Sequence, residues 1–112
     1  RDSIYFFKDP EEYFEKAVKK YCKGEELPAN LAKLHDRLDA LENWEAELIE
    51  AELRNVAEEL ELSAAKLIHP LRIGTTGMGV SPDIFQICQM LGKEIILRRM
   101  ENLKRYLEHR NK

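Results

Sequence analysis

The sequence predicts an all-α fold, a compact bundle of five to six helices, and three observations support this. Apolar residues recur at spacings of three and four along most of the 112-residue chain, which is the period of an amphipathic helix. There is no alternating run of strand length and no internal repeat. The balance of 44% hydrophobic and 35% charged residues suits a soluble folded chain rather than a disordered one. We expect one domain over residues 1–112, with a linker and first helix over 1–27 and the helical core over 28–112.

Local capping signals place the first two helices. Asp9, Pro10 and Glu12 have the order of an N-cap, a first-position proline and a capping-box acid. We therefore expect a helix to begin at Asp9 and to end by Gly24. A second helix is expected to open near Pro28. Its apolar stripe would contain Leu31, Leu34, Leu38 and Leu41.

A third helix is predicted from about Trp44 to Leu60, and Trp44 is expected to anchor the junction between two helices. Ser63 can cap a short helix that stops before Pro70, because the residue before a proline is disfavoured in the α region. The apolar face of the third helix would comprise Leu48, Ile49, Leu53, Val56, Ala57 and Leu60.

A glycine-rich loop is predicted next, because three of the five glycines lie within six residues, from Gly74 to Gly79. Glycine permits positive φ and lets a ligand approach the backbone closely. Ser81 and Pro82 then resemble an N-cap followed by a first-position proline. They predict a further helix that runs to Leu91.

The last helix is expected from Lys93 to about His109, after Gly92 as a C-terminal cap. Its inward face would hold Ile96, Met100, Leu103 and Leu107, and its outward face Arg98, Arg99, Lys104, Arg105 and Arg110. Charge is uneven along the chain, since residues 1–65 carry a net −8 and residues 66–112 a net +5. A positive C-terminal half suggests contact with a polyanion.

Catalytic, metal-binding and nucleotide-binding patterns are not found. The three histidines are scattered, and the glutamates of residues 42–61 occupy the polar face of a helix. No P-loop or dinucleotide-binding glycine motif occurs. Cys22 and Cys88 are interpreted as buried thiols rather than a disulfide or half of a metal site. We therefore expect no catalytic residue, no metal and no cofactor in this chain.

An RNA-binding site is the functional hypothesis for the loop and its flanks. Arg72 offers a planar fork of donors for a base edge, with a salt bridge or a cap on loop carbonyls as the alternative. Pro82, Ile84 and Phe85 are candidates for stacking on bases, although Ile84 and Phe85 could equally be core residues. The phosphate-contact candidates are Arg98, Arg99, Lys104 and Arg105, with a solvated face as the alternative.

These motifs also resemble a known family. The strongest part is residues 66–100, where K-L-I-H-P-L-R is followed by G-T-T-G-M-G-V-S-P-D-I-F, then L-G-K-E and an arginine-rich helix. Residues 4–21 and 42–60 add a linker with its helix and a Trp-led helix. Together they resemble the C-terminal anticodon-binding region of bacterial-type, class I glutamyl-tRNA synthetases.

The resemblance implies an α-helical cage that grips the anticodon loop of tRNA(Glu), with tRNA(Gln) as a second candidate. Arg72 would contact an anticodon base, and Ser81, Pro82, Ile84 and Phe85 would recognise or stack on anticodon nucleotides. ATP and Mg²⁺ would belong to the N-terminal catalytic domain of a longer parent chain. Because the sequence has neither an initiator methionine nor a signal peptide, we expect it to be part of such a chain.

The expected protein is a cytoplasmic monomer that binds neither DNA nor a membrane, since no apolar run approaches the roughly 20 residues of a membrane span. The alternative function is a helical protein-interaction module that docks an apolar partner on Pro82, Ile84 and Phe85. Salt would separate the two, because phosphate binding weakens steeply with ionic strength and apolar docking hardly does.

Overall fold

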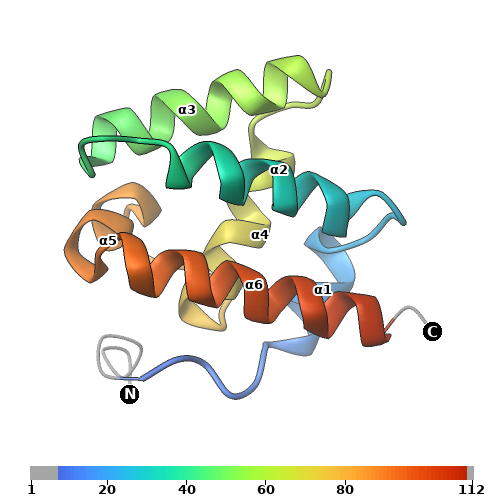
Figure 1. Cartoon of the computed structure of the whole chain (residues 1–112). Coiled ribbons are helices and arrows are strands. Elements are labelled where there is room, and N and C mark those ends of the chain that lie inside the picture. The colour runs from blue at the N-terminus through green and yellow to red at the C-terminus, as the bar shows by residue number, and fades with distance from the viewer. Residues whose placement is uncertain (1–7, 111–112) are drawn as a thin grey trace.

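The computed structural model describes residues 8–110, which form six α-helices and no strand. This confirms the all-α prediction and the expected number of helices. α2 lies between α3 and α6, and α4 crosses behind them at a steep angle, with α1 and α5 near opposite ends of α6 (Figure 1). The radius of gyration is 12.7 Å. The helices are α1 (Glu15–Tyr21), α2 (Leu27–Asp39), α3 (Ala46–Glu59), α4 (Ala65–Thr76), α5 (Ile84–Leu91) and α6 (Lys93–Arg110).

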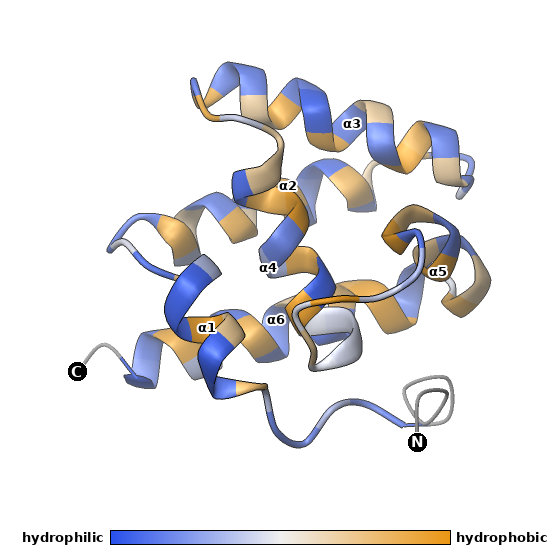
Figure 2. Ribbon diagram, turned by 180° about the vertical axis from the view of Figure 1, so that it is seen from behind, coloured by the Kyte–Doolittle hydropathy of each residue, from blue (hydrophilic) through white to orange (hydrophobic). Residues whose placement is uncertain are grey.

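The hydrophobic core has two parts that meet along α4 and α6. Figure 2 shows α5 as mostly hydrophobic, and it packs on α3, α4 and α6. The larger part includes Leu34, Leu38, Ile49, Leu53, Val56, Leu67, Leu71, Ile84, Phe85, Ile96 and Met100. The smaller part surrounds α1 and consists of Ala17, Val18, Cys22, Leu27, Leu31, Ile73, Leu103 and Leu107. The predicted stripes of α2, α3 and α6 supply about half of the core residues, while Leu48 is 39% exposed.

The first helix begins later than expected, at Glu15 rather than Asp9. Asp9 caps no helix, because its carboxylate accepts hydrogen bonds from Arg98 and Arg99 of α6. We call residues 8–14 the N-terminal strap. At its end the Phe14 N–H donates to the carbonyl of Gly77 at 2.8 Å. Residues 1–7 of the expected linker lie outside the described part of the chain.

The expected helix end before Pro70 is also wrong, because α4 continues through this proline to Thr76. The ring removes one backbone donor, but Pro70 and its neighbours Leu67, Leu71 and Ile73 are buried on the faces of α4. We attribute the tolerance to this burial. Gly74 is therefore helical and lies against α6, where a Cβ would come within 3.3 Å of Leu103 Cδ2.

The loop between α4 and α5 is consequently shorter than predicted and runs from Gly77 to Asp83, which we call the α4–α5 loop. Gly77 ends α4 in the left-handed region, with φ of 80°. α5 starts at Ile84, and its N-cap is Asp83, whose Oδ1 accepts from the Phe85 N–H at 2.9 Å. Ser81 is not the N-cap that the sequence predicted, because its hydroxyl donates to the carbonyl of Pro82. The predicted C-terminal cap of α5 at Gly92 is confirmed.

Both cysteines are free and buried. Burial raises the pKa of Cys88 to about 12 and that of Cys22 to about 11, so neither thiol forms a reactive thiolate near neutral pH. Within residues 8–110 there is no helix long and apolar enough to cross a membrane. The same residues contain no cluster of three or more metal-ligating side chains.

Trp44 joins the start of α3 to the end of α5, since its indole Nε1 donates to the carbonyl of Cys88 at 2.8 Å. Trp44→Phe should keep most of the packing and lose this bond. We expect the free energy of unfolding to fall by about 1 kcal/mol, the usual net value of a hydrogen bond. Urea denaturation would measure the loss, and an unchanged midpoint would show that water replaces the indole.

Candidate nucleic-acid interface

Arg72, on the last turns of α4, is held by two side chains. Its Nε donates to Ser81 Oγ at 3.0 Å, and its Nη1 donates to His69 Nδ1 at 3.1 Å. Among residues 8–110 no further side-chain partner of Arg72 is found, so its remaining guanidinium donors can serve a ligand. The structure thus brings together Arg72 and Ser81, which the sequence analysis proposed as partners in one site.

His69 lies flat against Tyr21 of α1, with ring centroids 3.9 Å apart and planes inclined by 15°. The ammonium of Lys20 lies 5.2 Å from the centroid of the Tyr21 ring. The pKa of His69 is lowered, first by burial and then by the charges of Arg72 and Lys20. α1 therefore forms one wall of the Arg72 site.

The α4–α5 loop borders this site and is held at its start and near its middle. The Thr76 hydroxyl donates to the carbonyl of Arg72 at 2.8 Å and accepts from the Met78 N–H at 3.1 Å. Gly79 lies so close to α1 that an added Cβ would be 2.9 Å from the Cβ of Ala17. The loop leaves Met78 46% and Val80 79% exposed.

The predicted stacking residues divide into one exposed and two buried side chains. Pro82 is exposed beside Ser81. Ile84 and Phe85 are only 2% and 7% exposed and belong to the larger part of the core. Of the alternatives that the sequence left open for these two residues, the core position is the one observed, and Pro82 is the member of the set that faces solvent.

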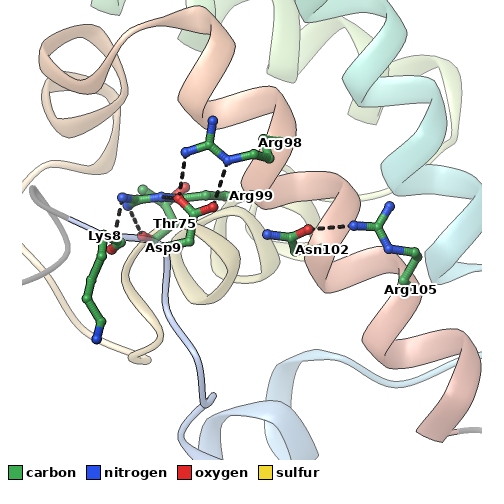
Figure 3. A network of polar contacts seen from close by, with 7 residues as sticks. All are labelled: Lys8, Asp9, Thr75, Arg98, Arg99, Asn102 and Arg105. Atoms are coloured by element: carbon green, nitrogen blue, oxygen red, sulfur yellow. Dashed lines mark hydrogen bonds and ion pairs between the residues drawn. The ribbon is translucent and has the colours of Figure 1, made fainter.

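Arg98 and Arg99 hold the N-terminal strap to α6 (Figure 3). Arg98 donates to both carboxylate oxygens of Asp9, at 2.7 and 2.9 Å. Arg99 is 2% exposed and donates to Asp9 Oδ1 at 2.8 Å, to the carbonyl of Thr75 at 2.7 Å and to the carbonyl of Lys8 at 3.1 Å. The Arg98 hydrogen bond, aided by Arg99 and opposed by burial, lowers the pKa of Asp9 to about 2.

Lys104 and Arg105 follow on α6 and have weaker partners. Lys104 pairs with Glu108 at 3.0 Å, and Arg105 donates to Asn102 Oδ1 at 2.6 Å. Partly exposed contacts of this kind contribute little to stability, so both side chains can turn towards a phosphate. Both residues line a shallow pocket between α2 and α6, and no contact joins either of them to Arg72 in the described chain.

Comparison with known proteins places this arrangement in a family. A family model described as "Anticodon binding domain" matches residues 1–104. The chain belongs to this family. An anticodon-binding domain binds tRNA, so the Arg72 site and its loop are set in a domain made for contact with RNA.

Curated relatives of this anticodon-binding domain are glutamate–tRNA ligases. The protein "Glutamate--tRNA ligase 1" of Alkalilimnicola ehrlichii is 40% identical over 100 residues, which cover 89% of this chain and 21% of that protein. "Glutamate--tRNA ligase" of Chlorobium chlorochromatii is 42% identical over 98 residues, covering 88% of this chain and 19% of that protein. The chain therefore spans about a fifth of the length of these relatives.

A solved structure agrees with this family. The crystal structure of a glutamate tRNA ligase from Elizabethkingia meningosepticum in complex with its amino acid superposes with a TM-score of 0.87 at 30% identity. The match covers 93% of this chain and 20% of that one. The resemblance inferred from the sequence is therefore confirmed for the family and for the fold.

His69 and Tyr21 are the site residues of this anticodon-binding domain that sequence reasoning missed. His69 was treated as an isolated histidine. Residues three apart on a helix are neighbours and His69 precedes Arg72 by three, but this signal was hidden because the helix was expected to stop before Pro70. The contact with Tyr21 had no sequence signal, since it depends on how α1 packs against α4.

Proposed function

We propose that this domain reads the anticodon loop of tRNA(Glu) as part of a glutamate–tRNA ligase, with tRNA(Gln) as a second candidate. The observation that carries the proposal is the position of Arg72, whose guanidinium is held by His69 and Ser81 and still has N–H donors available to a ligand. In the same proposal the ATP- and Mg²⁺-dependent attachment of glutamate takes place in a separate catalytic domain of the parent, and the parent is a cytoplasmic monomer. The glutamate–tRNA ligases among the relatives support this assignment.

The chemistry of the site suits unstacked bases. A guanidinium presents several donors in one plane and can meet the acceptors on a base edge. The Ser81 hydroxyl, whose proton is donated to the carbonyl of Pro82, adds an acceptor next to it, and Pro82 supplies an exposed apolar surface for stacking. Ile84 and Phe85 act from beneath, by holding the start of α5 in place against the core.

Phosphate contacts are assigned to the basic residues of α6 according to how firmly each side chain is already held by other partners. Lys104 and Arg105 are the better candidates, because their partners are exposed or partly exposed side chains. Arg98 has one exposed face but already holds Asp9 at both oxygens. The guanidinium of Arg99 is buried. Its part in the proposal is therefore indirect, because it holds the strap against α6.

Arg72→Ala should reduce discrimination between a glutamate anticodon stem-loop and the same stem-loop altered at one anticodon base. We expect the affinity ratio to fall by about tenfold, the effect of removing one good hydrogen-bonded pair with a base. Fluorescence anisotropy at low and moderate salt would measure it. Arg54→Ala is the matched control, because Arg54 lies on α3 and pairs only with Glu50 in the described chain. An unchanged ratio in a folded Arg72→Ala variant would contradict the proposal.

The double substitution Lys104→Ala with Arg105→Ala should weaken binding to all stem-loops alike. We expect the slope of log affinity against log salt to become shallower by about two, one for each phosphate that is no longer neutralised. Arg98 and Arg99 are unsuitable for this test, because their removal would also release the strap. A slope that stays the same would show that these side chains do not contact phosphate. Binding with no salt dependence at all would instead favour a protein-interaction module, although Ile84 and Phe85 are too buried to form its surface.

A further inference from the structure

We propose that His69 is a positioning residue for Arg72, and that protonation of His69 releases Arg72 and weakens base discrimination. The inference rests on the proposed function of Arg72. It concerns a histidine that does not itself need to touch RNA. Three observations carry it: the hydrogen bond from Arg72 to His69, the stacking of His69 on Tyr21, and the positively charged side chains near His69.

The hydrogen bond fixes the protonation state of His69. A guanidinium has five donors and no acceptor, so Arg72 Nη1 can only donate to His69 Nδ1. Nδ1 must therefore offer its lone pair, which makes the imidazole neutral with its proton on Nε2. Together with Ser81 on Nε, this bond holds the guanidinium of Arg72 at two points.

The ring stack fixes the orientation of His69. Tyr21 covers one face of the imidazole at a centroid distance of 3.9 Å, and Lys20 approaches the Tyr21 ring. An added Cβ on Gly79 would lie 3.9 Å from Tyr21 Cε2, so the loop in turn bounds Tyr21. The plane of the imidazole, and with it the direction of Nδ1, is set by α1 and the loop.

Charges around His69 oppose its protonation. Arg72 and Lys20 act on it directly, and the groove beside it also carries Lys23, Glu26 and Lys66. Positive groups outnumber the single acid. The pKa of His69 accordingly lies below its usual value of 6.5. When the ring is protonated, an Nδ1–H faces a guanidinium N–H that lies about one hydrogen-bond length away, and two cations repel each other.

The test compares base discrimination at about pH 7.5 with a lower pH at which NMR shows the imidazole of His69 to be protonated, which lies below the ordinary histidine pKa. For the unmodified chain we expect the affinity ratio of cognate to altered stem-loop to fall about tenfold at the lower pH, as when a charged hydrogen bond is broken. His69→Asn keeps an acceptor near the position of Nδ1 and cannot titrate, so its ratio should not change with pH. His69→Leu should show the low ratio at both pH values.

His109→Gln is the matched control, because His109 lies exposed near the end of α6 and its replacement should leave the pH dependence intact. The inference is overturned if the ratio of the unmodified chain is constant with pH, or if His69→Asn retains the full dependence. An absence of discrimination in the unmodified chain at the higher pH would instead contradict the proposed function.

Nitrogen NMR of the imidazole tests the inference without RNA. We expect the Nε2–H tautomer for His69 and a pKa that rises in Arg72→Ala, because a repelling charge is removed. The Nδ1–H tautomer, or a pKa indifferent to Arg72, would overturn the positioning role whatever the RNA binding shows.

Discussion

Asp9→Asn should lower the free energy of unfolding by about 3 kcal/mol, the cost of breaking an ion pair that has a buried member. Arg99 is 2% exposed, and its Nε donates to the Asp9 carboxylate at 2.8 Å. An asparagine would keep one acceptor oxygen but no charge. The carbonyls of Thr75 and Lys8 would remain as neutral acceptors, and they keep the destabilisation from being larger. Urea denaturation followed by circular dichroism would measure it.

Glu11→Gln is the control for that substitution, because Glu11 is a strap carboxylate whose side chain is 78% exposed and which, within residues 8–110, pairs only with Lys8. Its effect should stay within about 0.5 kcal/mol, as for most surface changes. The double variant Asp9→Asn with Arg99→Met should be less destabilised than Asp9→Asn alone, because the buried guanidinium is removed together with the carboxylate that balances it. A destabilisation near 1 kcal/mol for Asp9→Asn, with no rescue by Arg99→Met, would contradict the buried pair.

The same pair gives a pH dependence with a definite sign. The folded-state pKa of Asp9 is about 2, below its ordinary value of 3.8. The ionised form therefore stabilises the fold, fully above about pH 4, and this contribution is lost as the pH falls from 3.8 towards 2. Asp9→Asn should remove this part of the acid dependence.

Gly77→Ala should lower the free energy of unfolding by about 2–3 kcal/mol, through left-handed backbone strain and a close contact. Gly77 has φ of 80°, and an added Cβ would lie 3.0 Å from the carbonyl oxygen of Glu12 and 3.3 Å from Pro10 Cβ. The obstacle is backbone of the strap, which cannot move aside without breaking the Phe14–Gly77 bond. Thermal unfolding would measure the effect.

Gly77→Asn separates the two causes, because asparagine tolerates the left-handed region better than alanine but adds the same Cβ. We expect it to remain destabilised by at least about 1 kcal/mol, which would be the share of the close contact. If Gly77→Asn is as stable as the unmodified chain, a Cβ at position 77 does not clash with the strap.

The sequence predicted a helix correctly wherever a regular apolar stripe packs against the core. The predicted start of α2 and both predicted ends of α3 and α6 lie within about two residues of those observed, because the leucine and isoleucine spacings of these helices are strong. Errors arose at Asp9, Pro70 and Ser81, where a local rule conflicted with tertiary contacts. Asp9 satisfies two arginines instead of a helix end, and burial of its neighbours carries α4 through Pro70.

The candidate site was predictable only in part. Arg72 and Ser81 were chosen from loop chemistry, and the structure brings them into contact. The contact of His69 with Arg72 follows from helix spacing only when α4 continues through Pro70, which the sequence did not predict. The contact of His69 with Tyr21 was not predictable, because Tyr21 is separated from His69 by two other helices along the chain. The burial of Arg99 could not be predicted from the sequence either, because Asp9, which pairs with it, lies 90 residues away along the chain.

The strap has a consequence for the order in which the domain folds. Asp9 and Arg99 are 90 residues apart, and α6, which carries Arg99, is the last helix along the chain and packs against α2, α4 and α5. Closing such a long loop costs entropy that only an already assembled partner can offset. During synthesis the strap can pair with α6 only after α6 has left the ribosome. The first described residues of the chain are therefore among the last to reach their folded positions. A substitution that weakens the pairing of Asp9 with Arg99 should therefore raise the unfolding rate of the domain more than it lowers the folding rate.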